Sequence, residues 1–255
     1  MPTVTLSAKI YNDNQLKHVE EHLKSSLKGL KVKIEKIQAT TQGWIQATFS
    51  GEDEKVALNY LENTIGLCPT HVSNLTKFST VRGYITDLSK SEEQLQLDIG
   101  LMMPKMINVT ISLRHLQAQL VDGRKIALKK IAELYGFCEN TPLTAKIVHL
   151  NKDRIEVTLA EDQLKLYKRW TKSLLDRLIV LGVSQQEIRT ALKNARCQND
   201  IVGIEQLGFF EHTVICKLGT DAVGLIPKVG KKMTAATLSV FSPKKILELL
   251  PDIIC

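Results

Sequence analysis

The period of the hydrophobic positions changes several times near the start of the chain. Polar and apolar residues alternate, as in β-strands, over residues 3–10, 31–37 and 44–49. Between and after these runs, apolar residues recur every three or four positions, as in helices, over residues 12–30 and 52–65. A stretch with Gly66 and Pro69 then marks a boundary. The pattern predicts a first α+β domain over residues 1–72, in the order βαββα.

The next segment is rich in alternating patterns. Three predicted strands lie at residues 80–88, 94–99 and 109–113, and a helix is predicted from the apolar spacing at 125–134. Two more alternating runs, 143–150 and 154–159, flank the turn Asn151-Lys152-Asp153 and predict a hairpin. These elements predict a β-rich domain over residues 76–162.

The helical period then returns. Residues 164–181 place Tyr167 and Trp170 on one side and basic residues on the other, and Gly182 ends the pattern. Ser184 and Glu187 fit the capping box of a second helix. The sequence therefore predicts a basic helical pair over residues 163–198.

The last segment, residues 199–255, begins with patterns that are typical of β-strands. One run leads into Gly208, a second alternates over 213–218, and a third begins at Val223 after a turn at Gly219. Pro243 then begins a predicted short helix. Together the four segments predict a multi-domain α+β protein that ends in a β-hairpin element.

Composition limits the class of protein. The chain has 255 residues, 44% hydrophobic and 24% charged, which is typical of a globular protein. No apolar run is long enough to span a membrane, and the N-terminus has no pattern of a secretion signal. The five cysteines are scattered, which fits neither a disulfide framework nor a zinc ribbon. We expect a reduced, cytoplasmic setting.

The positive charge is local. The net charge is +7, and residues 163–196 alone carry eight basic and two acidic side chains, 8 − 2 = +6. Such a concentration is typical of a surface that faces a polyanion, although most charged helix faces are simply solvated. Both interpretations stay open. Membrane binding is less favoured, because the apolar side of the helix is needed for packing.

Catalytic motifs are scarce. His18 and His22 fit the H-x-x-E-H pattern of a zinc peptidase group, but the apolar stripe of that helix predicts that both histidines point to solvent. The sequence contains neither a phosphate-binding glycine loop followed by Lys-Ser or Lys-Thr nor a Gly-x-Ser-x-Gly motif. We therefore expect no enzyme activity, no cofactor and no metal site.

Several short motifs suggest a known module. Gly83-Tyr84 and Gly208-Phe209 each place an aromatic residue after a glycine at a predicted strand, Asp98-Ile99-Gly100 ends another, and residues 224–227 read Gly-Leu-Ile-Pro. These features resemble S-one-type RNA-binding modules, a branch of the OB-fold. The resemblance implies an OB-like barrel at 76–162, a second OB-like element at 199–255, and RNA as the ligand. The second strand departs from the pattern, because residues 94–97 lack the family's exposed aromatic.

The order of the segments also resembles an uncharacterised archaeal protein family of unknown function. That resemblance implies a cytosolic archaeal protein of the information-processing machinery. The leading hypothesis is a non-enzymatic RNA-binding protein, associated with the ribosome or another ribonucleoprotein. The alternative is an accessory module of transcription or translation that docks on a protein through its barrel; the oligomeric state is left open. The RNA-binding residues assigned by this hypothesis are Arg82, Tyr84, Arg114, Lys165, Lys168, Arg169, Lys172, Arg189, Lys193, Phe209, Phe210, Lys217, Lys228, Lys231 and Lys232. Phe209 and Phe210 fit a core position equally well.

Overall fold

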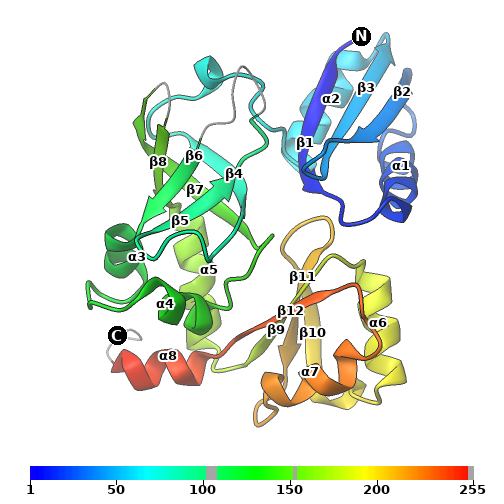
Figure 1. The fold of residues 1–255 in the computed structure, drawn as a ribbon. Coiled ribbons are helices and arrows are strands. Elements are labelled where there is room, and N and C mark those ends of the chain that lie inside the picture. The colour runs from blue at the N-terminus through cyan, green and yellow to red at the C-terminus, as the bar shows by residue number, and fades with distance from the viewer. Residues whose placement is uncertain (102–107, 152–153, 252–255) are drawn as a thin grey trace. The chain divides into compact units, whose positions relative to one another are not determined.

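A computed structural model describes residues 1–101, 108–151 and 154–251 (Figure 1). The chain divides into two compact units. The first is Met1–Leu75 with a segment from Ile99, and the second contains the rest of the chain. No helix in the described ranges is long and apolar enough to cross a membrane.

The first unit has the predicted βαββα order. It consists of β1 (Thr3–Lys9), α1 (Asn14–Ser26), β2 (Val32–Ala39), β3 (Trp44–Gly51) and α2 (Glu54–Thr64). The sheet is antiparallel in the order β1-β3-β2. Helix α1 buries Val19 and Leu23 and leaves His18 and His22 exposed, as its apolar stripe predicts.

A closed five-stranded barrel begins the second unit. Its strands are β4 (Thr80–Ile85), β5 (Gln94–Asp98), β6 (Asn108–Ser112), β7 (Pro142–Leu150) and β8 (Arg154–Leu159), in the order β4-β5-β6-β8-β7. Only the closing pair β6–β8 is parallel among the described strand pairs of this barrel. Alternate residues such as Leu95, Leu97 and Val157 fill the interior.

Two helices connect β6 to β7, where the sequence predicts one. Helix α3 (Leu113–Leu120) begins directly after β6, because the Ser112 hydroxyl accepts a hydrogen bond from the backbone N–H of His115 at 3.3 Å. Helix α4 (Leu128–Tyr135) follows and ends at Gly136, which has φ 69°. The strand predicted at residues 109–113 therefore ends at Ser112, and helix α3 begins at the next residue.

The prediction of a basic helical pair over residues 163–198 is wrong. Helix α5 (Glu161–Lys172) ends earlier than predicted, and Arg177–Leu181 forms strand β9, with all five residues buried. The apolar run from Leu178 to Leu181 fits a buried helix or a buried strand equally well by its pattern. Its place between two other strands, which cover both of its edges, selects the strand.

Strand β9 belongs to an open, antiparallel sheet. After it come α6 (Gln185–Asn194), β10 (Ile201–Gln206), β11 (Glu211–Cys216), α7 (Ala222–Gly230), β12 (Thr237–Phe241) and α8 (Pro243–Leu249). The sheet order is β10-β11-β9-β12. From β9 to β12 the elements therefore follow the order βαββαβ of a ferredoxin-like motif.

The prediction of a second OB-like element at residues 199–255 is also wrong. The stretch that begins at Val223 is helix α7 rather than a third strand. The Asp221 side chain caps this helix by accepting from the N–H of Val223 at 2.9 Å, and Ala222, Leu225 and Val229 are buried at helical spacing. An open four-stranded sheet with helices on one face is not a barrel.

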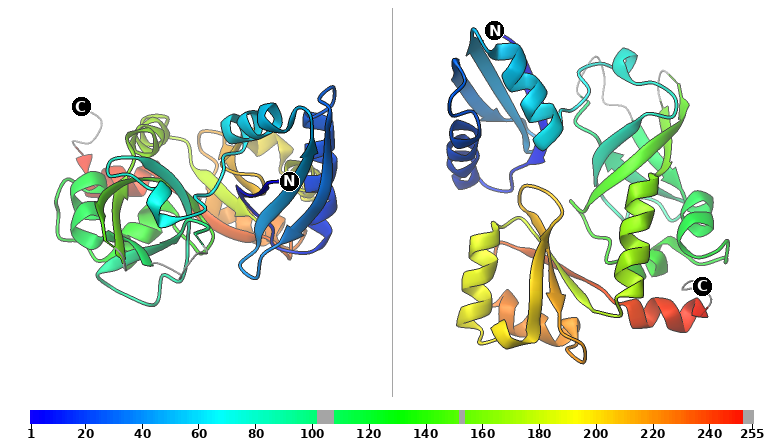
Figure 2. Two further views of the ribbon diagram at one scale, coloured as in Figure 1. Left: turned by 90° about the horizontal axis from the view of Figure 1, so that it is seen from above. Right: turned by 180° about the vertical axis from the view of Figure 1, so that it is seen from behind.

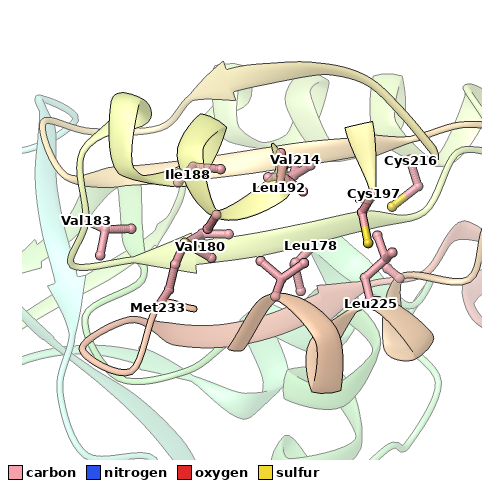
Figure 3. Close-up of a cluster of buried hydrophobic side chains, with 13 residues drawn as sticks. Leu178, Val180, Val183, Ile188, Leu192, Cys197, Val214, Cys216, Leu225 and Met233 are labelled. Carbon is pink, nitrogen blue, oxygen red and sulfur yellow. The ribbon is translucent and has the colours of Figure 1, made fainter. Parts of the chain in front are cut away.

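Helices α6 and α7 cover one face of this sheet. Their buried residues, including Ile188, Leu192 and Leu225, pack in one cluster with Leu178 and Val180 of β9 (Figure 3). Residues on the opposite face of the sheet pack against α5, which runs from the barrel to α8 (Figure 2).

Candidate nucleic-acid interface

The outer surface of α6 and α7 carries a group of exposed cations, called here the cationic layer. On α6, Arg189 and Lys193 are four residues apart, so they lie on one face of the helix, and Arg196 follows just after the helix ends. At the end of α7, Lys228 is followed three residues later by Lys231 and then directly by Lys232. The cationic layer consists of Arg189, Lys193, Arg196, Lys228, Lys231 and Lys232, all exposed.

Local structure sets the orientation of this layer. Helix α6 begins with a capping box, as predicted: the Ser184 hydroxyl accepts from the N–H of Glu187 at 3.3 Å, and the Glu187 carboxylate accepts from the N–H of Ser184 at 2.7 Å. Because Ile188 and Leu192 point into the core, the residues that follow each of them, Arg189 and Lys193, lie on the exposed side of the helix. Glu187, two residues before Arg189, is thus engaged in capping the helix.

The charges of the cationic layer have no acidic partner among the residues that the structure describes. Within the described ranges, none of the six side chains forms an ion pair. Lys193 and Lys228 lie in the last turns of their helices, where the helix dipole stabilises a cation. Like charges on neighbouring helices repel one another at low salt, so the layer gains stability when a polyanion binds.

The predicted basic residues of α5 are not part of this surface. Lys165, Lys168, Arg169 and Lys172 are all exposed, but α5 packs on the sheet face opposite α6 and α7. Lys165 lies 3.4 Å from Asp162 and 3.8 Å from Glu161, and Arg169 pairs with Glu205. The structure therefore divides the predicted basic surface into two rows on opposite sides, and the α5 row is partly neutralised.

The aromatic residues predicted to stack on bases are mostly inaccessible. Tyr84 is fully buried, and its hydroxyl donates to the Glu211 carboxylate at 3.4 Å. Phe210 is 2% exposed, and Phe209 is half-buried with its ring 5.0 Å from that of Phe210. The structure therefore leaves neither Tyr84 nor Phe210 exposed for stacking on a base: Tyr84 is buried against Glu211 of β11, and Phe210 is covered at the start of that strand.

Arg82 is also part of that packed surface. Its guanidinium donates to the Leu207 carbonyl, which joins β4 to the loop after β10. A cavity of about 220 Å³ adjoins this contact and is lined by residues that include Gln163, Trp170 and Glu205. Several of its polar groups are paired with one another: Trp170 Nε1 donates to Glu205 at 3.1 Å, and Gln163 accepts from the N–H of Thr144 at 3.1 Å. The cavity therefore lies where strands of the barrel, helix α5 and the C-terminal sheet pack together.

A buried cation contacts Trp170, one of the residues that line the cavity. Arg177 is 4% exposed, and its guanidinium donates to the Trp170 carbonyl at 3.3 Å and to the Ser173 hydroxyl at 2.9 Å, with its carbon 5.1 Å from the centre of the Trp170 ring. Burial lowers the pKa of the Arg177 guanidinium. Arg177 is therefore held as an internal cation that fixes the end of α5 to β9.

The two remaining residues predicted to bind RNA, Arg114 and Lys217, belong to segments other than α6 and α7. Arg114 is exposed in α3, and Lys217 is exposed directly after β11. Sequence reasoning overlooked an exposed aromatic, Phe78, whose ring centre lies 5.0 Å from the Lys77 ammonium and 5.5 Å from the Lys146 ammonium. No strong signal marks it in the sequence, because it precedes the first barrel strand in a short polar stretch.

Family models match the chain in three consecutive parts. They are the DUF2110 N-terminal domain at residues 3–71, the central domain at 76–171 and the C-terminal domain at 175–241. The chain belongs to the DUF2110 family. The DUF2110 central domain contains the barrel and α5, and its C-terminal domain contains the sheet from β9 to β12.

Comparison with solved structures gives weak similarities. The a/eIF2alpha–aDim2p–rRNA complex from Pyrococcus horikoshii OT3 matches at 10% identity and a TM-score of 0.26, over 71% of this chain and 95% of that chain. The intact aIF2 alpha subunit from Pyrococcus abyssi matches at 8% and 0.26, over 66% and 97%. A putative exosome complex RNA-binding protein matches at 12% and 0.25, over 69% and 95%. No curated protein matches the sequence.

Proposed function

We propose that this DUF2110 protein is a non-enzymatic RNA-binding protein that attaches to structured RNA through the cationic layer, as part of the ribosome or another ribonucleoprotein. The observation that carries the proposal is the layer itself: six exposed cations on and just after α6 and α7, without ion-pair partners among the described residues. Arginine and lysine side chains that neutralise phosphates release counterions, which supplies most of the affinity for nucleic acid.

The barrel is consistent with this function. The order β4-β5-β6-β8-β7, with one parallel closing pair, is the strand order of an OB-fold. In OB-folds the second and third strands and two loops bind oligonucleotides. Here the outer side of β5 presents Gln94 and Gln96, which hydrogen-bond but do not stack. The charge contacts of the cationic layer therefore dominate, and the proposed binding is tolerant of sequence.

The experiment compares two triple variants with the same change in charge. One is Lys193→Glu, Lys228→Glu and Lys231→Glu in the cationic layer; the other is Lys165→Glu, Lys168→Glu and Lys172→Glu in α5. All six positions are exposed, so both proteins should fold. Fluorescence anisotropy with a labelled RNA hairpin measures the dissociation constant from low to moderate salt.

The layer variant should lose most of its affinity. Each phosphate contact contributes about 0.7–0.9 to the slope of log K against log salt, so removing three contacts lowers that slope by about 2–3. The α5 variant should keep a larger slope. If only the α5 variant loses affinity, the RNA face is α5 and the assignment to the layer is wrong. If the wild-type protein binds no RNA at low salt, RNA binding itself is refuted.

A protein-interaction role is the second candidate. It is favoured by the outer face of β5, where Gln94 and Gln96 replace an aromatic platform, a composition that suits a polar protein contact as well as RNA. In this case the barrel docks on a partner of the transcription or translation machinery. Affinity for that partner would change little with salt and would survive ribonuclease treatment, which separates it from the first proposal.

A further inference from the structure

An exposed phenylalanine, Phe78, lies just before the first strand of the barrel. The Phe78 side chain is 61% exposed, although large aromatic residues are usually buried. It lies two residues before β4, in a turn closed by a hydrogen bond from the Ser79 N–H to the Thr76 carbonyl at 3.1 Å. The Ser79 hydroxyl also donates to that carbonyl, at 2.7 Å. The ring is therefore presented by a defined turn.

The backbone of Phe78 is in an unfavourable conformation for its side chain. Its φ is +71°, while that of Lys77 is not positive, which places Phe78 at the third position of a type II turn. Glycine or asparagine normally occupies that position, because a side chain there crowds the backbone. An exposed aromatic contributes little to the core, so the fold alone does not explain why phenylalanine stands here.

Two backbone hydrogen bonds hold Phe78 and the next residue, Ser79, beside β7. The N–H of Phe78 donates to the Ile147 carbonyl at 2.9 Å, and the N–H of Ile147 donates to the Ser79 carbonyl at 3.0 Å. This pairing places the ring next to Lys146, whose ammonium lies 5.5 Å from the ring centre. The Lys77 ammonium lies 5.0 Å from it. An aromatic surface and two cations are thus gathered by backbone contacts.

The surroundings are polar. In the barrel, Lys146 pairs across the strands with Thr80 on β4 and with Thr158 on β8, so the three side chains form a row on the outer surface. Within the described ranges, neither Lys77 nor Lys146 forms an ion pair. The row offers hydroxyl groups and a cation next to the ring.

We propose that Phe78, Lys77 and Lys146 form a stacking site for an unpaired nucleotide of single-stranded RNA. The base stacks on the ring, which accepts any base because every base has a flat face. The flexible lysine stems move aside, and their ammonium groups bind the adjacent phosphates. A base within a duplex already stacks on its neighbours, so the site selects unpaired segments. An apolar protein partner fits less well, because it would have to desolvate two cations.

This site rests on the proposed RNA function and adds a ligand preference to it. The cationic layer binds phosphates of structured RNA, whereas the Phe78 site recognises an unpaired base. The two sites can be tested separately because they belong to different parts of the sequence and respond to different RNA forms. We therefore expect the protein to bind a hairpin with a single-stranded tail more tightly than the same hairpin without one.

The test uses both hairpins and two substitutions. Phe78→Asn removes the ring and suits the positive φ, so the variant should fold at least as well as the wild type. Phe78→Tyr keeps a ring and serves as the matched control. We expect Phe78→Asn to weaken binding of the tailed hairpin by roughly 5- to 150-fold, the range for one stacked base, and to leave the blunt hairpin unchanged. Phe78→Tyr should stay close to the wild type.

A fluorescent base gives a direct readout. With 2-aminopurine in the tail, wild-type protein should quench the fluorescence by stacking, and Phe78→Asn should not. If Phe78→Asn binds the tailed hairpin as tightly as the wild type, the stacking site is refuted while the RNA function stands. If both hairpins lose affinity equally, the residue acts through the fold, and the site is also refuted. If the wild type binds neither hairpin, the proposed function fails with it.

Discussion

An aromatic cluster joins the DUF2110 central and C-terminal domains, and we expect Phe241→Ala to show how much stability it supplies. Phe241 on β12 is fully buried. Its ring centre lies 5.1 Å from that of Trp170 and 6.1 Å from that of Tyr167, both on α5, and 5.9 Å from that of Tyr135 on α4. The substitution removes a side chain shared by the C-terminal sheet and two helices of the central domain.

The expected magnitude follows from burial. Replacing a buried phenylalanine by alanine costs about 3–5 kcal/mol, because both the transfer free energy and the packing around the cavity are lost. With a urea m-value of about 2–3 kcal/mol per M, the unfolding midpoint falls by about 1–2.5 M. That loss is a large part of the roughly 5–15 kcal/mol that stabilises a typical domain.

Tryptophan fluorescence measures this change where it occurs. The chain has two tryptophans, so a Trp44→Phe background leaves only Trp170, inside the cluster, as the reporter. Leu218→Ala, at a side chain that is 78% exposed, is the control and should change the free energy of unfolding by less than about 0.5 kcal/mol. A Trp170 midpoint that Phe241→Ala leaves unchanged would show that the two domains do not share this core.

Three further predictions concern local features of the second unit. Gly136→Ala should lower the melting temperature strongly, because φ is +69° and a Cβ would lie 3.0 Å from the Val240 carbonyl oxygen and 2.7 Å from the Ile179 side chain; an unchanged melting temperature would contradict the geometry. Ser184→Ala should cost about 1 kcal/mol of unfolding free energy by removing the cap of α6, whereas Ser184→Asp should retain most of it. Burial lowers the pKa of the His212 imidazole below its unfolded value near 6.5, so the unfolded state binds more protons as the pH falls. The free energy of unfolding should therefore be constant above about pH 7.5 and decrease through pH 6.5, by at most about 1.4 kcal/mol per pH unit, and denaturant titrations of His212→Gln should show a flatter profile.

Local patterns in the sequence determined much of the architecture. The alternating and helical periods predict the βαββα order of the first unit and the strand segments of the barrel, because each of these elements buries one face and exposes the other. The capping box at Ser184 and Glu187 begins α6 as predicted, since it depends only on residues within one helical turn. The same short-range logic places Arg189 and Lys193 on the exposed side of that helix.

Tertiary structure decided the features in which both faces of an element are covered. Strand β9 lies between two other strands with its five residues buried, so its apolar run carries no period that distinguishes it from helix. The separation of the α5 and α6 cations likewise depends on β9, which sets the two helices on opposite faces of one sheet.

The aromatic residues show the same division. A glycine followed by an aromatic residue occurs at Tyr84 and at Phe209, but the packing of the barrel on the sheet decides that Tyr84 is buried. Phe78 lies in a plain polar stretch, and pairing with Ile147, far along the chain, presents its ring beside Lys146. Sequence determines which side chains exist and their local period; exposure depends on which distant surface covers them, and only the folded chain supplies that surface.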